Sequence, residues 1–337
     1  MKIKKKILNT LIISFTTIVL ALIVFEISYR FQIFDFYKAE LKGLNSKEEL
    51  KSEKPKILVC GDSFSASPDS YVKVIKDSLK EYSVINASVP GSGIVQHAIY
   101  MPGRIKKFKP EIFVYQFYIG NDLFDISHPI SSSKLSFSRK VYWWITDRLI
   151  SLSFLNFRFA GVKYNYYDDA KVNDGPKEKE LFSIANYSNR EKLNYKAETG
   201  LLENTLYLLN GREKDLLRFE KKFKSMINFL DPSTRKVFIV IPHQAQVSEY
   251  YFNSHNQLGA DFKNRIYSAD SKSYPIYLRL AKLCDELGFE FVDPLDQFRL
   301  IDATQQLYYS NDPHLNNSGS FVLGIMLANR LKQFSNN

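Results

Sequence analysis

Short apolar runs alternate with amphipathic segments along most of this chain of 337 residues. The apolar runs predict strands at 56–60, 82–87, 111–118, 236–241 and 289–292. Apolar residues at helical spacing predict helices at 70–81, 94–108, 213–230, 273–287 and 318–334. The alternation predicts a three-layer α/β/α fold, in which helices cover both faces of a central parallel sheet. Ligands bind such sheets beyond the carboxyl ends of the strands, so residues that come after the strands are the first candidates for function.

Small polar motifs follow the first three predicted strands. Ser63 follows the first strand, Gly91 comes after the second, and Asn121 lies just beyond the third. A fourth motif near the C-terminus holds Asp312 and His314, which are separated by one proline. Because parallel strands end at the same edge of a sheet, we expect the first three motifs to lie along that edge.

Acyl transfer needs the types of residue that these motifs contain. A serine hydroxyl is a poor nucleophile at neutral pH and needs an adjacent base, usually a histidine that is held by a carboxylate. Asp312 and His314 are close enough in sequence for one loop to present both side chains. The backbone N–H groups of Ser63 and Gly91 and the side-chain amide of Asn121 could stabilise the negative charge of a tetrahedral intermediate.

The motifs resemble the sequence blocks of the SGNH (GDSL-type) hydrolase superfamily, in an arrangement that spans most of the chain. Ser63, Gly91 and Asn121 match blocks I, II and III, and block V is matched by Asp312 with His314. The resemblance implies a flavodoxin-like SGNH hydrolase fold. It also implies that Ser63 is the nucleophile, His314 the general base and Asp312 the residue that orients this base. Ser63, Gly91 and Asn121 would then form the oxyanion hole.

Two positions depart from the usual blocks of this superfamily. Phe64 stands where block I usually has leucine. Ile119 stands where block III usually has glycine, two residues before Asn121, and Gly120 lies next to it. The second departure concerns the geometry of the loop that carries Asn121 rather than the amide itself.

The N-terminus carries four lysines ahead of an uncharged run at 7–25. This run is close to the ~20 residues that a helix needs to cross a bilayer. It is longer than the ~7–15-residue apolar region of a signal peptide, and no clear Ala-x-Ala site follows it. We therefore expect an uncleaved signal anchor at 7–26, with residues 1–6 in the cytoplasm and the rest outside the cell membrane. The alternative is a cleaved signal peptide and a soluble secreted lipase.

The remaining chain is expected to form a juxtamembrane stalk and one domain. Residues 27–54 are the predicted stalk, and 55–334 form the hydrolase-like domain, with an insertion at about 125–211. So long a segment between a strand and its next helix is unusual. We expect the insertion to lie over the active-site face and shape substrate choice, or else to pack a small core of its own or sit near the membrane. His128 in the insertion and His243 after the fourth strand are candidates for lining the substrate cleft.

The formal net charge of +10 does not indicate a nucleic-acid partner, because several lysines belong to the N-terminus and no recognition motif is present. A basic surface that faces anionic lipid or polymer fits the charge better. Cys60 and Cys284 are interpreted as buried thiols, and no Cys/His spacing indicates a zinc site. No metal or organic cofactor is implied.

Taken together, the motifs and the anchor predict a membrane-anchored, extracytoplasmic serine esterase or O-acyltransferase. Its expected substrates are ester-linked acyl groups, acetyl above all, of cell-envelope carbohydrate or lipid. Its expected partners are the lipid bilayer and a membrane protein of an O-acetylation system. The alternative is a non-catalytic, carbohydrate-binding scaffold subunit of an envelope polysaccharide assembly or O-acetylation complex. The sequence does not choose between hydrolysis and acyl transfer.

Overall fold

The computed structural model describes residues 2–127, 136–159, 177–178, 180–187, 192, 195 and 200–333. These residues divide into two compact units. The helical unit lies within Met1–Phe36 and Ser132–Tyr166, and the sheet unit lies within Tyr37–Ser131 and Tyr167–Asn337. Each unit is described by itself.

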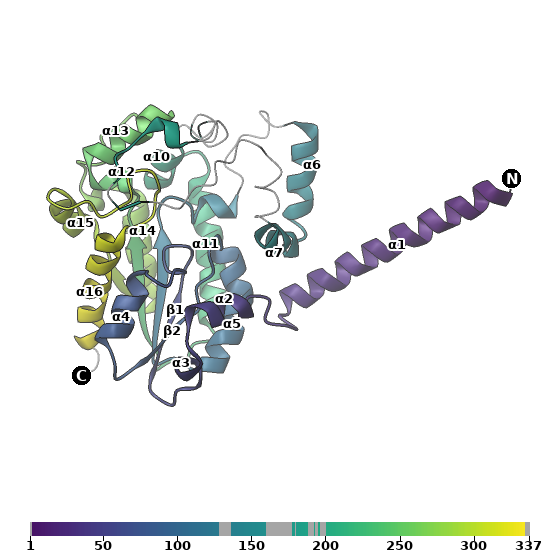
Figure 1. Cartoon of the computed structure of the whole chain (residues 1–337), viewed down its shortest axis with the longest axis horizontal. Helices are drawn as coiled ribbons and strands as arrows, with labels where there is room; N and C mark the ends of the chain where they lie inside the picture. Colours follow the sequence, from purple (N-terminus) through teal and green to yellow (C-terminus); the bar gives the residue numbers. More distant parts are fainter. Residues whose placement is uncertain are drawn as a thin grey trace. The chain divides into compact units, whose positions relative to one another are not determined.

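The sheet unit is built on five parallel strands (Figure 1). The strands are β1 (Lys56–Cys60), β2 (Ser83–Asn86), β3 (Ile112–Tyr118), β4 (Arg235–Ile241) and β5 (Glu290–Val292). Their order is β2-β1-β3-β4-β5, and each neighbouring pair is parallel. All seven positions of β3 are buried, as expected for a strand covered on both faces. The predicted parallel sheet is confirmed, and its strand order is the flavodoxin-like one.

Helices cover both faces of this sheet. The main ones are α4 (Tyr71–Ser78), α5 (Ile94–Phe108), α11 (Arg212–Ile227), α14 (Pro275–Leu287) and α16 (Asn317–Gln333). The shorter ones are α2 (Lys38–Leu44), α3 (Lys47–Lys51), η1 (Phe124–Ile126), η3 (Ile184–Asn186), α10 (Leu201–Leu206), α12 (Gln244–Val247), α13 (Glu249–Leu258), η4 (Ser271–Ser273) and α15 (Leu295–Asp302).

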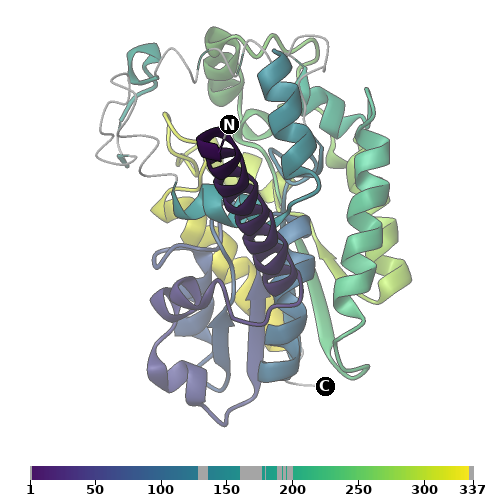
Figure 2. The same ribbon diagram turned by 90° about the vertical axis from the view of Figure 1, so that its right-hand side faces the viewer.

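The main helices form two layers. Helix α4 packs against α16 on one face, and α5 packs against α11 on the other (Figure 1). An ion pair of 3.1 Å between Arg279 and Glu220 joins α14 to α11, which runs alongside the strands in the turned view (Figure 2). Gly324 allows α16 to approach α4 closely, because a Cβ there would lie only 2.4 Å from the Cβ of Val74.

The structure differs from the expected stalk at 27–54. Helices α2 and α3 occupy much of this segment and pack on the sheet unit, where Leu41 is buried. The side chain of Asn45 donates to the carbonyl of Asn86 at 2.7 Å and accepts from its N–H at 2.8 Å, so it pairs with the end of β2. Ser46 caps α3. The polar residues that suggested a solvated linker thus serve as caps and tertiary contacts.

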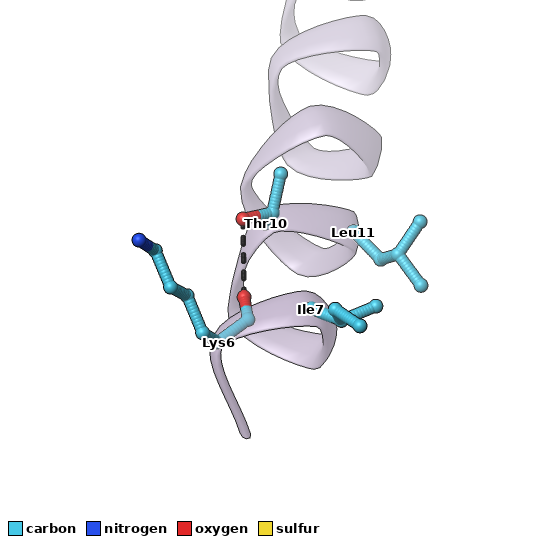
Figure 3. Close-up of a pocket in the computed structure, with 4 residues that line it drawn as sticks. All are labelled: Lys6, Ile7, Thr10 and Leu11. Carbon is cyan, nitrogen blue, oxygen red and sulfur yellow. Dashed lines mark hydrogen bonds between the residues drawn. The ribbon is translucent and has the colours of Figure 1, made fainter. Parts of the chain in front are cut away.

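The helical unit contains α1 (Lys2–Arg30), α6 (Phe137–Thr146) and α7 (Ser151–Arg158). By length and composition, Lys6–Arg30 is able to cross a membrane. The hydroxyl of Thr10 donates to the carbonyl of Lys6 at 3.0 Å (Figure 3), so this polar group is satisfied within the helix. Such internal pairing is what a helix needs where no water is available.

Candidate active site

Ser63 lies on a tight turn at the carboxyl end of β1. The backbone N–H of Asp62 donates to the side-chain oxygen of Gln116 on β3 at 3.0 Å. The carboxylate of Asp62 accepts from the N–H of Phe64 at 2.9 Å, and its carbonyl accepts from the N–H of Ala66 at 2.9 Å. Asp62 therefore ties the turn to β3 on one side and to the backbone of Phe64 and Ala66 on the other. Ser63 lies within this turn, directly after Asp62.

The structure brings together the three residues that the sequence pairs as nucleophile, base and acid. The Oγ of Ser63 lies 2.7 Å from the Nε2 of His314. The Nδ1 of His314 lies 2.5 Å from the Oδ1 of Asp312, which also accepts from the backbone N–H of His314 at 2.8 Å. In this arrangement the carboxylate holds the imidazole through Nδ1 and leaves Nε2 facing the serine, which is the geometry of a Ser-His-Asp triad.

Asp312 and His314 lie on a constrained loop between α15 and α16. An isolated antiparallel bridge joins Tyr308 to Leu315 across the loop. The loop also packs closely on the start of α16, since a Cβ on Gly319 would lie 2.1 Å from a backbone oxygen. One loop therefore presents the side chains of Asp312 and His314 at a fixed spacing.

Part of the insertion braces this loop. The side chain of Asn311, next to Asp312, donates to the carbonyl of Leu181 and accepts from the N–H of Ser183, each at 2.9 Å. Glu178 accepts from the backbone N–H of Asn317 at 2.9 Å, on the other side of the loop. The insertion thus contacts the backbone that carries the candidate acid and base.

The charges of the site shift the pKa values of His314 and Asp312 in opposite directions. Burial by itself lowers the pKa of His314, but the hydrogen bond and charge of Asp312, together with the charge of Asp62, outweigh burial and raise it. Burial by itself raises the pKa of Asp312, but the hydrogen bonds and charge of His314 outweigh it and lower that pKa. The pair therefore favours an ionised carboxylate beside a basic imidazole.

The candidate oxyanion donors lie on the loops that come after β1, β2 and β3. Within the described part of the chain, the backbone N–H groups of Ser63 and Gly91 donate to no other protein group. Gly91 has a φ of +67°, which places its backbone in the region that favours glycine. The side-chain amide of Asn121 lies beside the carboxylate of Asp62. Burial raises the pKa of Asp62, and the amide of Asn121 is one of the smaller effects that oppose this rise. These donors remain candidates whose role is a prediction.

The two departures from the family blocks have a structural explanation. The ring of Phe64 packs on the imidazole of His314 at a centroid distance of 4.7 Å and on Tyr118 at 4.2 Å. A larger ring in place of leucine therefore covers one face of the candidate base. The ring of Tyr118 folds over Gly120, where a Cβ would lie 2.3 Å from a ring carbon. The glycine is thus needed one position later than in the usual block.

His243 is nine-tenths buried at the start of α12. Its Nδ1 accepts from the N–H of Ala245 at 3.1 Å, and its ring stacks on Tyr118 at 6.1 Å and lies 4.7 Å from the ring of His255. Burial, with a smaller effect of the His255 charge, lowers its pKa well below the ordinary value. His243 therefore caps α12 from a buried position, and its ring contacts Tyr118 beside the candidate site. The other cleft candidate, His128, lies outside the described residues.

Sequence reasoning missed the buried polar support beneath the turn. Besides Asp62, the side-chain oxygen of Gln116 accepts from the hydroxyl of Ser65 at 3.0 Å, and Ser65 also pairs with the hydroxyl of Tyr71 at 2.6 Å. Gln116 is fully buried in the middle of an otherwise apolar strand. A single polar residue inside such a run is the signal that could have identified it, because buried polar groups need partners.

Gly61 is expected to tolerate no side chain. A Cβ there would lie 2.3 Å from the side-chain oxygen of Gln116 and 2.6 Å from the Oγ of Ser65, both of which are buried and hydrogen-bonded. We expect Gly61→Ala to destabilise the full chain by about 1–3 kcal/mol through overpacking. Urea unfolding of the detergent-solubilised protein would measure this change.

Gly103→Ala is the matched control. Gly103 lies within helix α5 with nothing within 4 Å of the added Cβ. Because alanine is favoured over glycine in a helix by about 1 kcal/mol, this variant should be unchanged or slightly more stable. Equal unfolding midpoints for the two variants would contradict the tight packing at Gly61.

Comparisons with known proteins add a limited finding. The sequence matches no protein-family model and no curated protein. Among solved structures, it is similar to TesA, with a TM-score of 0.40 and 12% identity over 81% of this chain and 97% of that one. The acetyl xylan esterase AlAXEase gives a TM-score of 0.40 and 13% identity over 82% and 98%.

A third solved structure is LAE5, an alpha/beta hydrolase enzyme from the metagenome of Lake Arreo, Spain. Its TM-score is 0.36, with 10% identity over 83% of this chain and 97% of that one. At these identities and TM-scores, the likenesses assign no activity to the chain. The sheet topology and the geometry around Ser63 are the observations on which a function can be proposed.

Proposed function

We propose that this protein is a serine esterase or O-acyltransferase that is anchored in the cell membrane and acts outside the cytoplasm. The observation that carries the proposal is the hydrogen-bonded series from Ser63 through His314 to Asp312. The serine and the two loop residues are far apart in sequence, and their side chains meet at the carboxyl end of a parallel sheet. An activated serine at that edge is what nucleophilic acyl transfer requires.

The proposed first step is attack on an ester. The Oγ of Ser63 bonds to the carbonyl carbon while its proton passes to the Nε2 of His314, and the carbonyl oxygen becomes an oxyanion. The N–H groups of Ser63 and Gly91 and the amide of Asn121 donate to this oxyanion. The carbon–oxygen bond to the leaving alcohol then breaks, and the alcohol takes the proton from His314.

The second step releases the acyl group from Ser63. His314 accepts a proton from water or from a sugar hydroxyl as that oxygen attacks the acyl-enzyme, and then returns the proton to Ser63. Water gives hydrolysis, and a sugar hydroxyl gives transfer. We propose that the acyl group, acetyl above all, comes from carbohydrate or lipid of the cell envelope, because the candidate anchor in α1 would keep the site near that layer. A membrane protein of an O-acetylation system would be a natural partner.

The direct test is labelling of the full chain in detergent with a fluorophosphonate, which bonds covalently to activated serines. We expect the wild-type protein to be labelled, and Ser63→Ala and His314→Ala to show no labelling. Ser67→Ala is the matched control, because Ser67 is exposed on the same turn region and should not affect the reaction. Labelling that persists in Ser63→Ala would contradict the proposed nucleophile.

A well-folded wild-type protein that is not labelled would support the alternative of a non-catalytic, carbohydrate-binding subunit. Ester hydrolysis with and without an added sugar acceptor would then separate the two catalytic possibilities. The ester would carry a label on its acyl group. If the sugar acceptor competes with water, the labelled acyl group should appear on the sugar. If the sugar does not compete, the labelled product should be the free acid only.

The pH dependence of kcat/KM provides a further prediction. The general base must be neutral, and Asp312 and Asp62 raise the pKa of His314 above its ordinary 6.5 against the opposing effect of burial. We therefore expect kcat/KM to fall as the pH drops through a midpoint above 6.5. Hydrolysis of a soluble aryl ester across a pH series would measure the midpoint. A midpoint below 6.5 would mean that burial outweighs the two carboxylates.

A further inference from the structure

Helix α7 of the insertion packs on the C-terminal end of α1, and α6 packs on α7. The carboxylate of Glu26 accepts from the N–H groups of Ile150 and Ser151, at 3.0 and 2.8 Å, and so caps the start of α7. Arg30, one turn later on α1, donates to the carbonyl of Arg148 at 2.9 Å. Polar contacts therefore join the start of α7, and the turn that precedes it, to the last turns of the apolar helix.

Aromatic contacts reinforce this junction. The ring of Phe154 on α7 lies 6.4 Å from Phe25, 6.0 Å from Tyr29 and 5.2 Å from Phe36. Tyr29 is fully buried there. Arg158 at the end of α7 donates to the carbonyl of Phe36 at 2.7 Å. The helical unit thus holds α7 at the level where the apolar run of α1 ends and is followed by Glu26 and Arg30.

Helix α6 leaves an apolar face uncovered at this level. Its side toward α7 includes Tyr142, whose hydroxyl accepts from the side chain of Asn156 at 2.6 Å. Phe137, Val141 and Trp144 follow one another at spacings of four and three residues, so they lie on one side of the helix. They are 82%, 40% and 58% exposed. This trio is called the α6 apolar face below.

The charged side chains within helix α6 are basic, and Asp147 caps its end. Helix α6 contains Arg139 and Lys140, both exposed, and no Asp or Glu. The guanidinium of Arg148 lies over the ring of Trp144, 4.1 Å from its centroid. Aromatic rings beside basic side chains on one helix are typical of segments that lie in the headgroup region of a membrane.

We propose that α6 lies in the headgroup region of the same bilayer that α1 crosses, with the α6 apolar face inserted among the lipids. The lipid surface is the occupant because α6 is joined through α7 to the end of the apolar helix, and because the residues that come after α1 also expose aromatic rings, such as Phe31 and Phe34. The basic residues favour a bilayer that contains anionic phospholipid. This inference rests on the membrane anchor of the proposed function and is independent of the esterase activity.

The two tryptophans of the chain, Trp143 and Trp144, both lie on α6, so intrinsic fluorescence reports on this helix alone. The full chain would be reconstituted into vesicles of phosphatidylcholine and phosphatidylglycerol, with and without bromine atoms at a shallow position of the acyl chains. Trp143→Phe leaves Trp144 as the reporter. Trp144→Phe is the matched control, because Trp143 is on a less exposed side of the helix.

We expect brominated lipid to lower the emission of Trp144 roughly twofold, because interfacial helices bury their apolar face about 5–10 Å into the headgroup–acyl boundary. Trp143 should change much less, and aqueous iodide should quench Trp144 weakly. Strong quenching of Trp144 by iodide and none by bromine would overturn the proposal and place the face in water. Protection from both quenchers would also overturn it and indicate that protein, such as a second copy, covers the face. Flotation of the vesicles tests the anchor separately. Protein that does not float with the vesicles is not bound to the bilayer, and the proposal depends on that binding.

Discussion

His314→Ala is expected to lower kcat for ester hydrolysis about 10⁶-fold, since removal of the base from a Ser-His-Asp unit costs nearly as much as removal of the whole unit. Ser63 would lose the acceptor that lies 2.7 Å from its hydroxyl, and no other described histidine is hydrogen-bonded to it. Purified full-length variants assayed with an aryl ester would measure the change, and circular dichroism would check the fold.

The double variant Ser63→Ala/His314→Ala sharpens this test. If the two residues act as one unit, the double variant should be no slower than either single variant. Multiplicative losses would instead mean that Ser63 and His314 contribute independently. In that case the 2.7 Å hydrogen bond between them would have no role in the reaction.

Local sequence could predict those features of the site that lie within a single motif. Ser63 and Asn121 each come after a run of apolar residues that could only be a strand, and the loops at the carboxyl ends of parallel strands gather at one edge of the sheet. Asp312 and His314 share one short loop, so their pairing needs no tertiary information. The local patterns could not show that Ser63 and His314, which are 251 residues apart, are hydrogen-bonded to each other.

Contacts that depend on distant partners were not predictable. Gln116 is a single polar residue in a strand. Its role as a hydrogen-bond acceptor for the turn at Asp62 can be recognised only from the folded structure. Glu26 looks like the first charge after an apolar run, yet it caps a helix that begins 125 residues later. The contact of Asn45 was hidden for the same reason, because within the predicted stalk it looks like a solvated residue until β2 provides its partner.

Asp312→Asn is expected to lower kcat about 10⁴-fold while leaving the fold intact, since a neutral partner stabilises the wrong tautomer of the imidazole. The asparagine amide would donate to Nδ1, where the carboxylate now accepts at 2.5 Å. The ring proton would then sit on Nε2, which could no longer accept the proton of Ser63. Full-length wild-type protein and variant, compared by kcat with the same aryl ester, would measure this loss.

The pH profile separates this cause from a merely structural one. Asp312 is the larger of the two carboxylate influences that raise the pKa of His314, so its removal should move the acid limb of kcat/KM to lower pH. Asp69→Asn is the matched control, because Asp69 makes an exposed ion pair with Lys73 and should alter neither rate nor midpoint. A loss of rate in Asp312→Asn with the midpoint unmoved would mean that Asp312 supports the loop without setting the charge of His314. A rate within about tenfold of wild type would show that His314 needs no carboxylate to orient it, against the role that such a group has in known triads.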